Sequence, residues 1–323
     1  MTIRSLSCRT LLFAGVSALA LAAASPEVRA ADLTPQPALV AKAPVIAPAG
    51  VWTWWAEGGA MWTGGDAVWL PQAPTGLGIA SESFKPRIGF EVAAGFDYRW
   101  PTSLWHVSAQ VRYGQAGTRT KTRTLAGYYT GYYWSANATA KHKERHWLVD
   151  FAVGRDIGIG LGQTQLKAGL RIAELQAKTT GAGSVYVSYY GTYNFSFAQR
   201  SKFLGVGPRV GLEGAVPLGG AWSIDWLAGA AVLFGDRKFD AAANVTGPIN
   251  LFGGGVTSSS NGSVLNVDAQ AGVSYAFNPN AKLTLSYRFD GYWNALRTFD
   301  AAGNIANQDR FYHGPMVRLT VRN

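Results

Sequence analysis

The chain has 323 residues and a formal net charge of +10; 48% of its residues are hydrophobic and 15% are charged. Soluble domains typically carry about 25% charged residues, so this composition argues against a protein whose whole surface meets water. No apolar run reaches the ~20 residues that a membrane-spanning helix needs, which argues against a helical membrane protein.

Residues 1–30 have the pattern of a secretory signal peptide. Arg4 and Arg9 precede the longest apolar run, Leu11–Ala24, and a small-x-Ala pattern ends at Ala30. We predict cleavage after Ala30. The only cysteine, Cys8, lies inside this signal, so disulfides, cysteine metal sites and cysteine nucleophiles are excluded from the mature chain.

Cleavage would lower the formal net charge from +10 to +8, because three arginines and one glutamate are removed. A basic chain suggests a nucleic-acid partner, but export argues against one. Anionic lipid headgroups or anionic solutes are the expected partners.

Residues 31–50 are rich in proline and alanine and have no hydrophobic period. This composition predicts an extended periplasmic segment. We interpret it as a tether, and contact with cell-wall material is the alternative.

Residues 51–323 predict a transmembrane β-barrel. In the stretch 200–216, Leu204, Val206 and Val210 alternate with polar or small residues, and Trp222 and Ile224 begin a second alternating run. A period of two gives a strand one apolar and one polar face. Tilted strands of about 9–11 residues span a bilayer. We predict ten strands, at residues 51–63, 86–99, 104–115, 144–156, 163–176, 200–216, 221–234, 262–277, 281–293 and 310–322.

The connections between these strands alternate in length. The short ones are 100–103, 157–162, 217–220 and 278–280, and the long ones are 64–85, 116–143, 177–199, 235–261 and 294–309. Outer-membrane barrels have short periplasmic turns and long extracellular loops. The sequence therefore predicts an all-β fold: a membrane-spanning antiparallel up-and-down barrel in the bacterial outer membrane, multi-pass, with both termini periplasmic.

Two long loops are rich in tyrosine, at residues 127–134 and 184–197. We expect strands that extend beyond the membrane there, or an extra hairpin. If both hairpins joined the wall, the barrel would have twelve or more strands. The first loop is also basic, and its side chains could meet lipopolysaccharide phosphates or be solvated. These residues are Arg119, Lys121, Arg123, Lys141 and Lys143.

Pro208 and Pro315 fall inside predicted strands. Proline cannot donate a hydrogen bond to the sheet, so an interior proline usually marks a bulge or an edge. Since a closed barrel has no edge, we expect a bulge at each.

The stretch GVGPRVGLEGAVPLGGAWSIDWLAGAAVLFG at residues 205–235 resembles a hairpin of the Legionella-type major outer-membrane protein family. The shared pattern is a G-P-R-x-G strand, a P-L-G turn, and a strand that ends in small residues. Residues 95–114 and 311–321 resemble that family's second hairpin and last strand. The resemblance implies a pore-forming outer-membrane β-barrel and identifies no solute.

The polar faces of the strands carry nearly balanced charges, which we interpret as pore-lining. Separated across an open lumen, such charges would sort ions; interlocked across a narrow one, they would plug it. The candidates are Glu57, Arg87, Glu91, Asp97, His106, Arg112, Asp150, Lys167, Arg171, Arg209, Glu213, Asp225, Asp268, Arg288, Asp290 and Arg318.

No constellation predicts an enzyme, a cofactor or a metal site. His106 with Ser108 is typical of an ordinary polar strand face, and His146 with Asp150 only imitates the pairs of outer-membrane hydrolases. The predicted function is a porin-like, narrow water-filled path for ions or small hydrophilic solutes. The expected partners are outer-membrane lipid and lipopolysaccharide, together with those small solutes or ions. The alternative is a structural or adhesive barrel with a closed lumen that acts through its Tyr-rich loops. No motif assigns an oligomeric state.

Overall fold

The computed structural model describes residues 50–66, 68–69, 83–84, 87–158, 163–248, 252–300 and 304–323. The predicted signal peptide at 1–30 and nearly all of the segment at 31–50 lie outside these residues. No helix within the described part is long and apolar enough to cross a membrane.

The described part is built from thirteen antiparallel strands. They are β1 (Val51–Gly65), β2 (Val68–Trp69), β3 (Ser83–Phe84), β4 (Arg87–Arg99), β5 (Trp105–Gly117), β6 (Arg119–Tyr129), β7 (Tyr132–Asp156), β8 (Gln163–Val187), β9 (Gly191–Gly219), β10 (Trp222–Thr246), β11 (Phe252–Asn278), β12 (Ala281–Phe299) and β13 (Ile305–Arg322).

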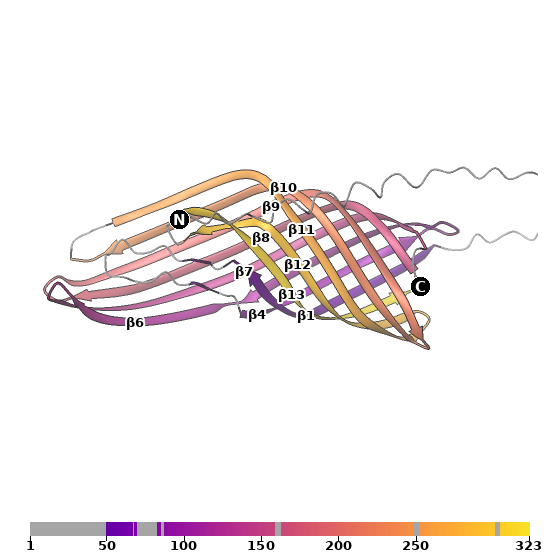
Figure 1. Cartoon of the computed structure of the whole chain (residues 1–323), viewed down its shortest axis with the longest axis horizontal. Helices are drawn as coiled ribbons and strands as arrows, with labels where there is room; N and C mark the ends of the chain where they lie inside the picture. Colours follow the sequence, from indigo (N-terminus) through magenta and orange to yellow (C-terminus); the bar gives the residue numbers. More distant parts are fainter. Residues whose placement is uncertain are drawn as a thin grey trace, which may run out of the picture. The chain divides into compact units, whose positions relative to one another are not determined.

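Ten of the described strands close a ring. Each pairs with the next along the chain from β7 to β13, β13 pairs with β1, and β1 continues through β4 and β5 back to β7. The strands run obliquely past one another in Figure 1. The predicted all-β, up-and-down barrel of about ten strands is therefore confirmed. The short strands β2 and β3 pair with each other, and β2 also pairs with β12.

Strand β6 continues β5 along the same edge of β7. Gln115 of β5 pairs with Arg145, and Arg119 of β6 pairs with His142. From Gln115 to Arg119 the chain advances four residues, while β7 advances three residues from Arg145 to His142. One extra residue therefore forms a bulge between β5 and β6. The Tyr-rich hairpins thus lengthen strands of the ring, and the twelve-strand alternative does not occur in the described residues.

Three predicted long loops are mostly strand. The stretches 116–143, 177–199 and 235–261 extend β5 to β11 well beyond the apolar part of the barrel. Hydrogen bonds between backbones need no apolar face, so pairing continues where the sequence is polar on both sides. We call this end of the barrel the hairpin end and the opposite end the short-turn end.

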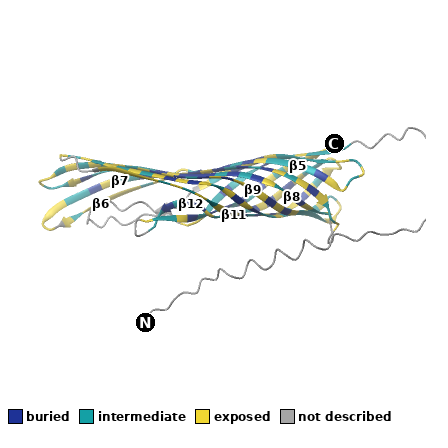
Figure 2. Cartoon of the chain, turned by 90° about the horizontal axis from the view of Figure 1, so that it is seen from above, coloured by how far each residue is buried: buried dark blue, intermediate teal, exposed yellow. Residues whose placement is uncertain are grey.

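The two faces of each strand divide as predicted. Exposed apolar side chains form a belt on the outer surface of the ring, and the residues that alternate with them are buried. Figure 2 shows buried and exposed positions alternating as coloured bands along the strands. On β7 the outward positions are Trp147, Val149, Phe151 and Val153, and Arg145 follows toward the hairpin end. The belt therefore ends on β7 between Trp147 and Arg145.

The prediction of a bulge at Pro208 and at Pro315 is wrong. Pro208 pairs with Leu170 and Pro315 with Tyr287, and the register is the same on both sides of each proline. A strand residue directs its N–H toward one neighbour only, so proline weakens the ladder on one side and leaves the other intact. Gly207, just before Pro208, allows close contact, because a Cβ there would lie 1.8 Å from a carbonyl oxygen of β10.

Candidate functional site

The inner faces of the ring bring most of the predicted charges together. Eleven of the predicted residues are buried: Glu57, Glu91, His106, Arg112, Asp150, Lys167, Arg171, Arg209, Asp268, Arg288 and Asp290. Four are partly exposed: Asp97, Glu213, Asp225 and Arg318. The backbone of Arg87 pairs with Gly117, and its side chain lies outside the described part. Whether these residues line a conducting path stays a prediction.

Five arginines and five carboxylates form what we call the central network. They come from nine strands of the ring, and only β10 supplies none. The members are Arg112, Arg171, Arg209, Arg288 and Arg318 with Glu57, Glu91, Asp150, Asp268 and Asp290. Their charges balance, as burial requires, because an unpaired buried charge costs several kcal/mol.

Arg288 of β12 contacts side chains from three other strands of the ring, β1, β4 and β11. Its guanidinium lies 2.5 Å from the Glu57 carboxylate, and it donates hydrogen bonds of 2.7 Å to Glu91 and to Gln270. Glu57 also accepts a 2.8 Å hydrogen bond from Arg318. Glu91 lies on β4, which is not a neighbour of β12 in the ring, so this contact crosses the lumen.

Arg112 makes a second contact across the lumen. It lies on β5 and donates a 2.5 Å hydrogen bond to Asp290 of β12, and its Nε is 3.6 Å from Glu91. His146 lies 3.1 Å from the other oxygen of Glu91 and stacks on Tyr312. Because these side chains are almost fully buried, the barrel is filled at this level.

Arg171 joins the remaining carboxylates. It donates two hydrogen bonds of 2.7 Å to Asp150 and one of 2.8 Å to Asp268. Asp268 also accepts a 2.8 Å hydrogen bond from Arg209, and Gln110 donates to Asp150. Arginine suits such a site because its planar fork binds carboxylates at two points.

An apolar cluster inside the barrel was missed by the sequence reasoning. It lies among buried inward positions toward the hairpin end, and includes Met61, Leu148, Leu175, Phe203, Leu233, Val264, Tyr292, Leu296 and Tyr312. Phe203 and Leu233 could have indicated this cluster in the sequence. Each is apolar at an inward position and stands next to an apolar outward residue, so the strict alternation of apolar and polar residues is interrupted there. Only the closed ring shows that these positions meet.

A polar cavity of about 450 Å³ lies at the short-turn end. Its lining includes Asp97, Lys167, Glu213, Gln270 and Arg318, and it reaches from the β11–β12 turn to the central network. The Lys167 ammonium lies 3.2 Å from Asp97 and 2.9 Å from Glu213. Asp97 and Glu213 are partly exposed here, and Lys167 is buried between them.

The histidines form no arrangement typical of a hydrolase. His106 is buried with its Nε2 3.6 Å from Asp97, and the partners of His146 are Glu91 and Tyr312. In the described part of the chain, no group of three or more His, Cys, Asp or Glu side chains could hold a metal ion. A third buried pair, His142 with Glu144, joins Arg310 near the hairpin end and was not anticipated.

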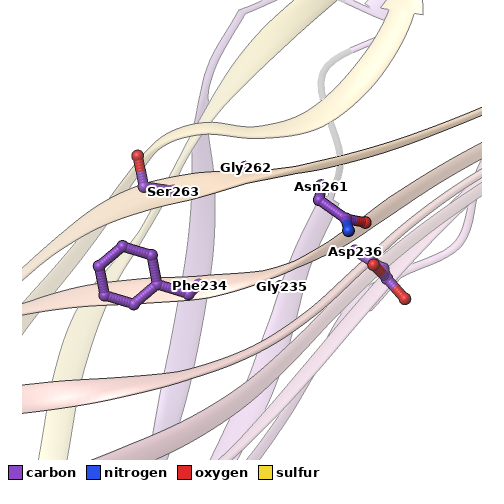
Figure 3. A pocket seen from close by; sticks show the side chains of 6 residues that line it. All are labelled: Phe234, Gly235, Asp236, Asn261, Gly262 and Ser263. Atoms are coloured by element: carbon purple, nitrogen blue, oxygen red, sulfur yellow. The ribbon is translucent and has the colours of Figure 1, made fainter.

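A hollow in the barrel wall lies where the apolar belt ends on β10 and β11. Gly235 and Gly262 face each other across these strands, flanked by Phe234, Asp236 and Asn261, as Figure 3 shows. The Arg237 guanidinium lies against Gly262, since a Cβ added there would be 2.6 Å from it, and it donates a 2.6 Å hydrogen bond to the carbonyl oxygen of Ser263.

Solved barrels resemble this chain in outline. The outer membrane protease OmpT from Escherichia coli aligns at 12% identity and a TM-score of 0.43, over 85% of this chain and 97% of that one. A major outer membrane protein from Thermus thermophilus aligns at 11% identity and a TM-score of 0.29, over 85% of this chain and all of that one. No curated protein matches the sequence.

A family model matches the chain over residues 80–322 of its 323. Its description is "Legionella pneumophila major outer membrane protein precursor". The match runs from the segment before β4 to the end of β13, and so includes all but the first strand of the ring. The chain, an outer-membrane β-barrel, therefore belongs to the Legionella pneumophila major outer membrane protein family.

Proposed function

We propose that the protein is a pore-forming outer-membrane barrel whose path is closed, in this conformation, by the central network. The short turns and both termini would face the periplasm, and the hairpin end would face outward. Small ions or hydrophilic solutes would enter the polar cavity from the periplasmic side and pass when the paired charges separate.

The observation that carries this proposal is the polar cavity that ends on the central network. An entrance lined by Lys167, Asp97 and Glu213 offers partners for ions of either sign. A barrel that only needed filling would be as stable or more stable with apolar side chains in place of buried ion pairs. Ten charged residues at the constriction are thus better explained by passage of ions than by packing.

The central network is also incompletely hydrogen-bonded. Nε of Arg112, Nε of Arg209 and one oxygen of Asp290 are buried and make no hydrogen bond within the described residues. A buried polar atom without a partner costs about 1–3 kcal/mol. This cost narrows the free-energy difference between the closed arrangement and one in which the charges are hydrated.

A second candidate function is a closed barrel that acts through its outer hairpins. The apolar cluster around Phe203 and Leu233 obstructs water beyond the network. At the hairpin tips Tyr128 and Tyr189 are 79% and 93% exposed, which suits contact with another surface.

Conductance in a planar bilayer separates the two candidates. The test compares the mature chain from residue 31 with Arg288→Met, which removes a lumen-crossing cation, and Arg155→Met, which removes an exposed cation on the outer face of β7 at the short-turn end. We expect small, infrequent steps from the parent chain, larger or more frequent steps from Arg288→Met, and parent-like behaviour from Arg155→Met. If folded parent and Arg288→Met protein are both silent at every voltage, the pore proposal is wrong.

The proposed orientation has its own test. The mature chain would contain no cysteine, so Tyr189→Cys at a hairpin tip and Asn280→Cys in a short turn introduce single thiols. A membrane-impermeant maleimide added to intact cells should label the first and spare the second. The reverse pattern would invert the topology and leave the conductance result unaffected.

A further inference from the structure

A group of basic residues lies on the outer surface of the barrel, directly beyond the apolar belt. In the row nearest the belt are Arg145 of β7, Lys202 of β9 and Lys238 of β10; in the next row are Lys143 of β7, Lys178 of β8 and Arg200 of β9. We call these six residues the outer basic patch.

The second row of the patch places three cations side by side. Lys143 pairs with Lys178, and Lys178 pairs with Arg200, on adjacent strands. Directly opposed residues of antiparallel strands have Cβ atoms about 4.5–5.5 Å apart, and like charges there are destabilising. All three side chains are exposed, and none makes an ion pair with another described residue.

The first row is partly neutralised. Lys202 lies 3.0 Å from Glu174, and Arg145 donates a 2.6 Å hydrogen bond to Gln176. These contacts hold two cations at the edge of the patch, next to the second row. Asp240, opposite Arg200 on β10, is the acidic neighbour in that row, so three cations face one carboxylate there.

The position of the outer basic patch relative to the apolar belt indicates which kind of ligand it could bind. The outward residues one row below are Trp147, Glu174, Leu204 and Asp236, and below them lie Val149, Ile172, Val206 and Phe234. Rows on one face are two residues apart, which is about 6.7 Å along a strand. The three cations of the second row therefore lie within a few rows of the apolar belt, at the level where the headgroups of a surrounding lipid would lie.

We propose that the outer basic patch binds the phosphate groups of a phosphorylated glycolipid of the outer leaflet, of the lipopolysaccharide type. Lys143, Lys178 and Arg200 would contact the phosphates, with Arg145 and Lys202 at the edge. Acyl chains would then lie along the apolar belt below. This site rests on the orientation proposed above, and it is independent of whether the lumen conducts.

Binding is tested with full-length mature protein in a nonionic detergent, using purified lipopolysaccharide as the probe. The test variant is Lys143→Gln with Lys178→Gln and Arg200→Gln. The matched control is Arg119→Gln with Lys121→Gln and Arg123→Gln. It removes three positive charges at the same end of the barrel, but these residues pair with His142, Ala140 and Ala138 on the inner face of β7. Folding of each variant is checked by heat-modifiable migration in gels.

We expect the test variant to bind lipopolysaccharide about a hundredfold more weakly than the parent, since each basic residue near an anionic surface contributes about fivefold. The control should bind like the parent. Parent binding should weaken with salt, and with lipopolysaccharide whose phosphates have been removed it should fall to the level of the test variant. Inorganic phosphate at millimolar concentration should not compete, because it lacks the acyl chains.

Two results would overturn the proposal. Equal lipopolysaccharide binding by parent and test variant would show that the patch is only solvated. Loss of binding in the control, with the test variant unaffected, would move the site to the inner face of β6. Because binding is measured in detergent, neither result depends on the membrane orientation or on conductance.

Discussion

Removal of the Arg288 guanidinium is the sharpest test of the interlocked lumen. Arg288→Met keeps much of the side-chain volume and deletes the charge that lies 2.5 Å from Glu57 and 2.7 Å from Glu91. Glu57 keeps Arg318 and Gln270 as partners. Glu91 keeps only the Arg112 guanidinium at 3.6 Å and His146 at 3.1 Å.

Glu91 is therefore the carboxylate that loses the largest share of its charge pairing in Arg288→Met. It is 1% exposed, so water cannot replace the lost cation without a change in the barrel. Breaking a buried ion pair from one side costs about 3–5 kcal/mol, and we expect Arg288→Met to lower the free energy of unfolding by that amount. A second substitution, Glu91→Gln, removes the orphaned charge and should restore more than half of the loss.

Urea unfolding of the refolded protein in lipid vesicles measures both changes. Lys282→Met is the control, since the Lys282 and Asp225 side chains are 34% and 22% exposed and a pair of this kind contributes about 0–1 kcal/mol. If Arg288→Met costs no more than Lys282→Met, or if Glu91→Gln adds to the loss, the central network is hydrated and does not interlock.

Two further predictions concern the wall of the barrel. Leu170→Arg, at an outward position in the apolar belt, should lower the free energy of unfolding in vesicles by about 2–4 kcal/mol. Tyr186→Arg, which is outward on the same strand but beyond the belt, should change this free energy by less than about 0.5 kcal/mol. Equal effects of the two substitutions would place the belt elsewhere. Gly207→Ala should impair refolding, because the added Cβ would lie 1.8 Å from the carbonyl oxygen of Val232. Gly211→Ala should refold well, because the atom nearest to its added Cβ would be 3.3 Å away. Equal refolding yields for the two variants would show that β9 and β10 can separate locally without cost.

The barrel itself was accessible from the sequence because a period of two is local. Leu204, Val206 and Val210 on one face of β9 and Trp222 and Ile224 on β10 identify two amphipathic strands without knowledge of any partner. The alternation of loop lengths then fixed the strand number at ten. Both features depend only on neighbours in the chain.

The ends of the strands were not accessible in the same way. Beyond the belt, 116–143 and 235–261 carry polar residues on both faces, so no period marks them as strand. They pair because adjacent backbones continue alongside them, a fact that depends on the closed ring. Pro208 shows the opposite case. The local sequence predicts an interruption of the strand there, but pairing of β9 with both β8 and β10 keeps the register unchanged.

For the candidate site, the sequence determined which charges point inward, and tertiary structure decided which of them meet. Arg112 and Asp290 are separated by 178 positions in the chain, and nothing in either strand selects the other as its partner. Strand tilt and stagger set the level of each side chain along the barrel. The same geometry brings Lys143, Lys178 and Arg200 into one row on the outside, because register between strands is a property of the sheet and not of any single strand.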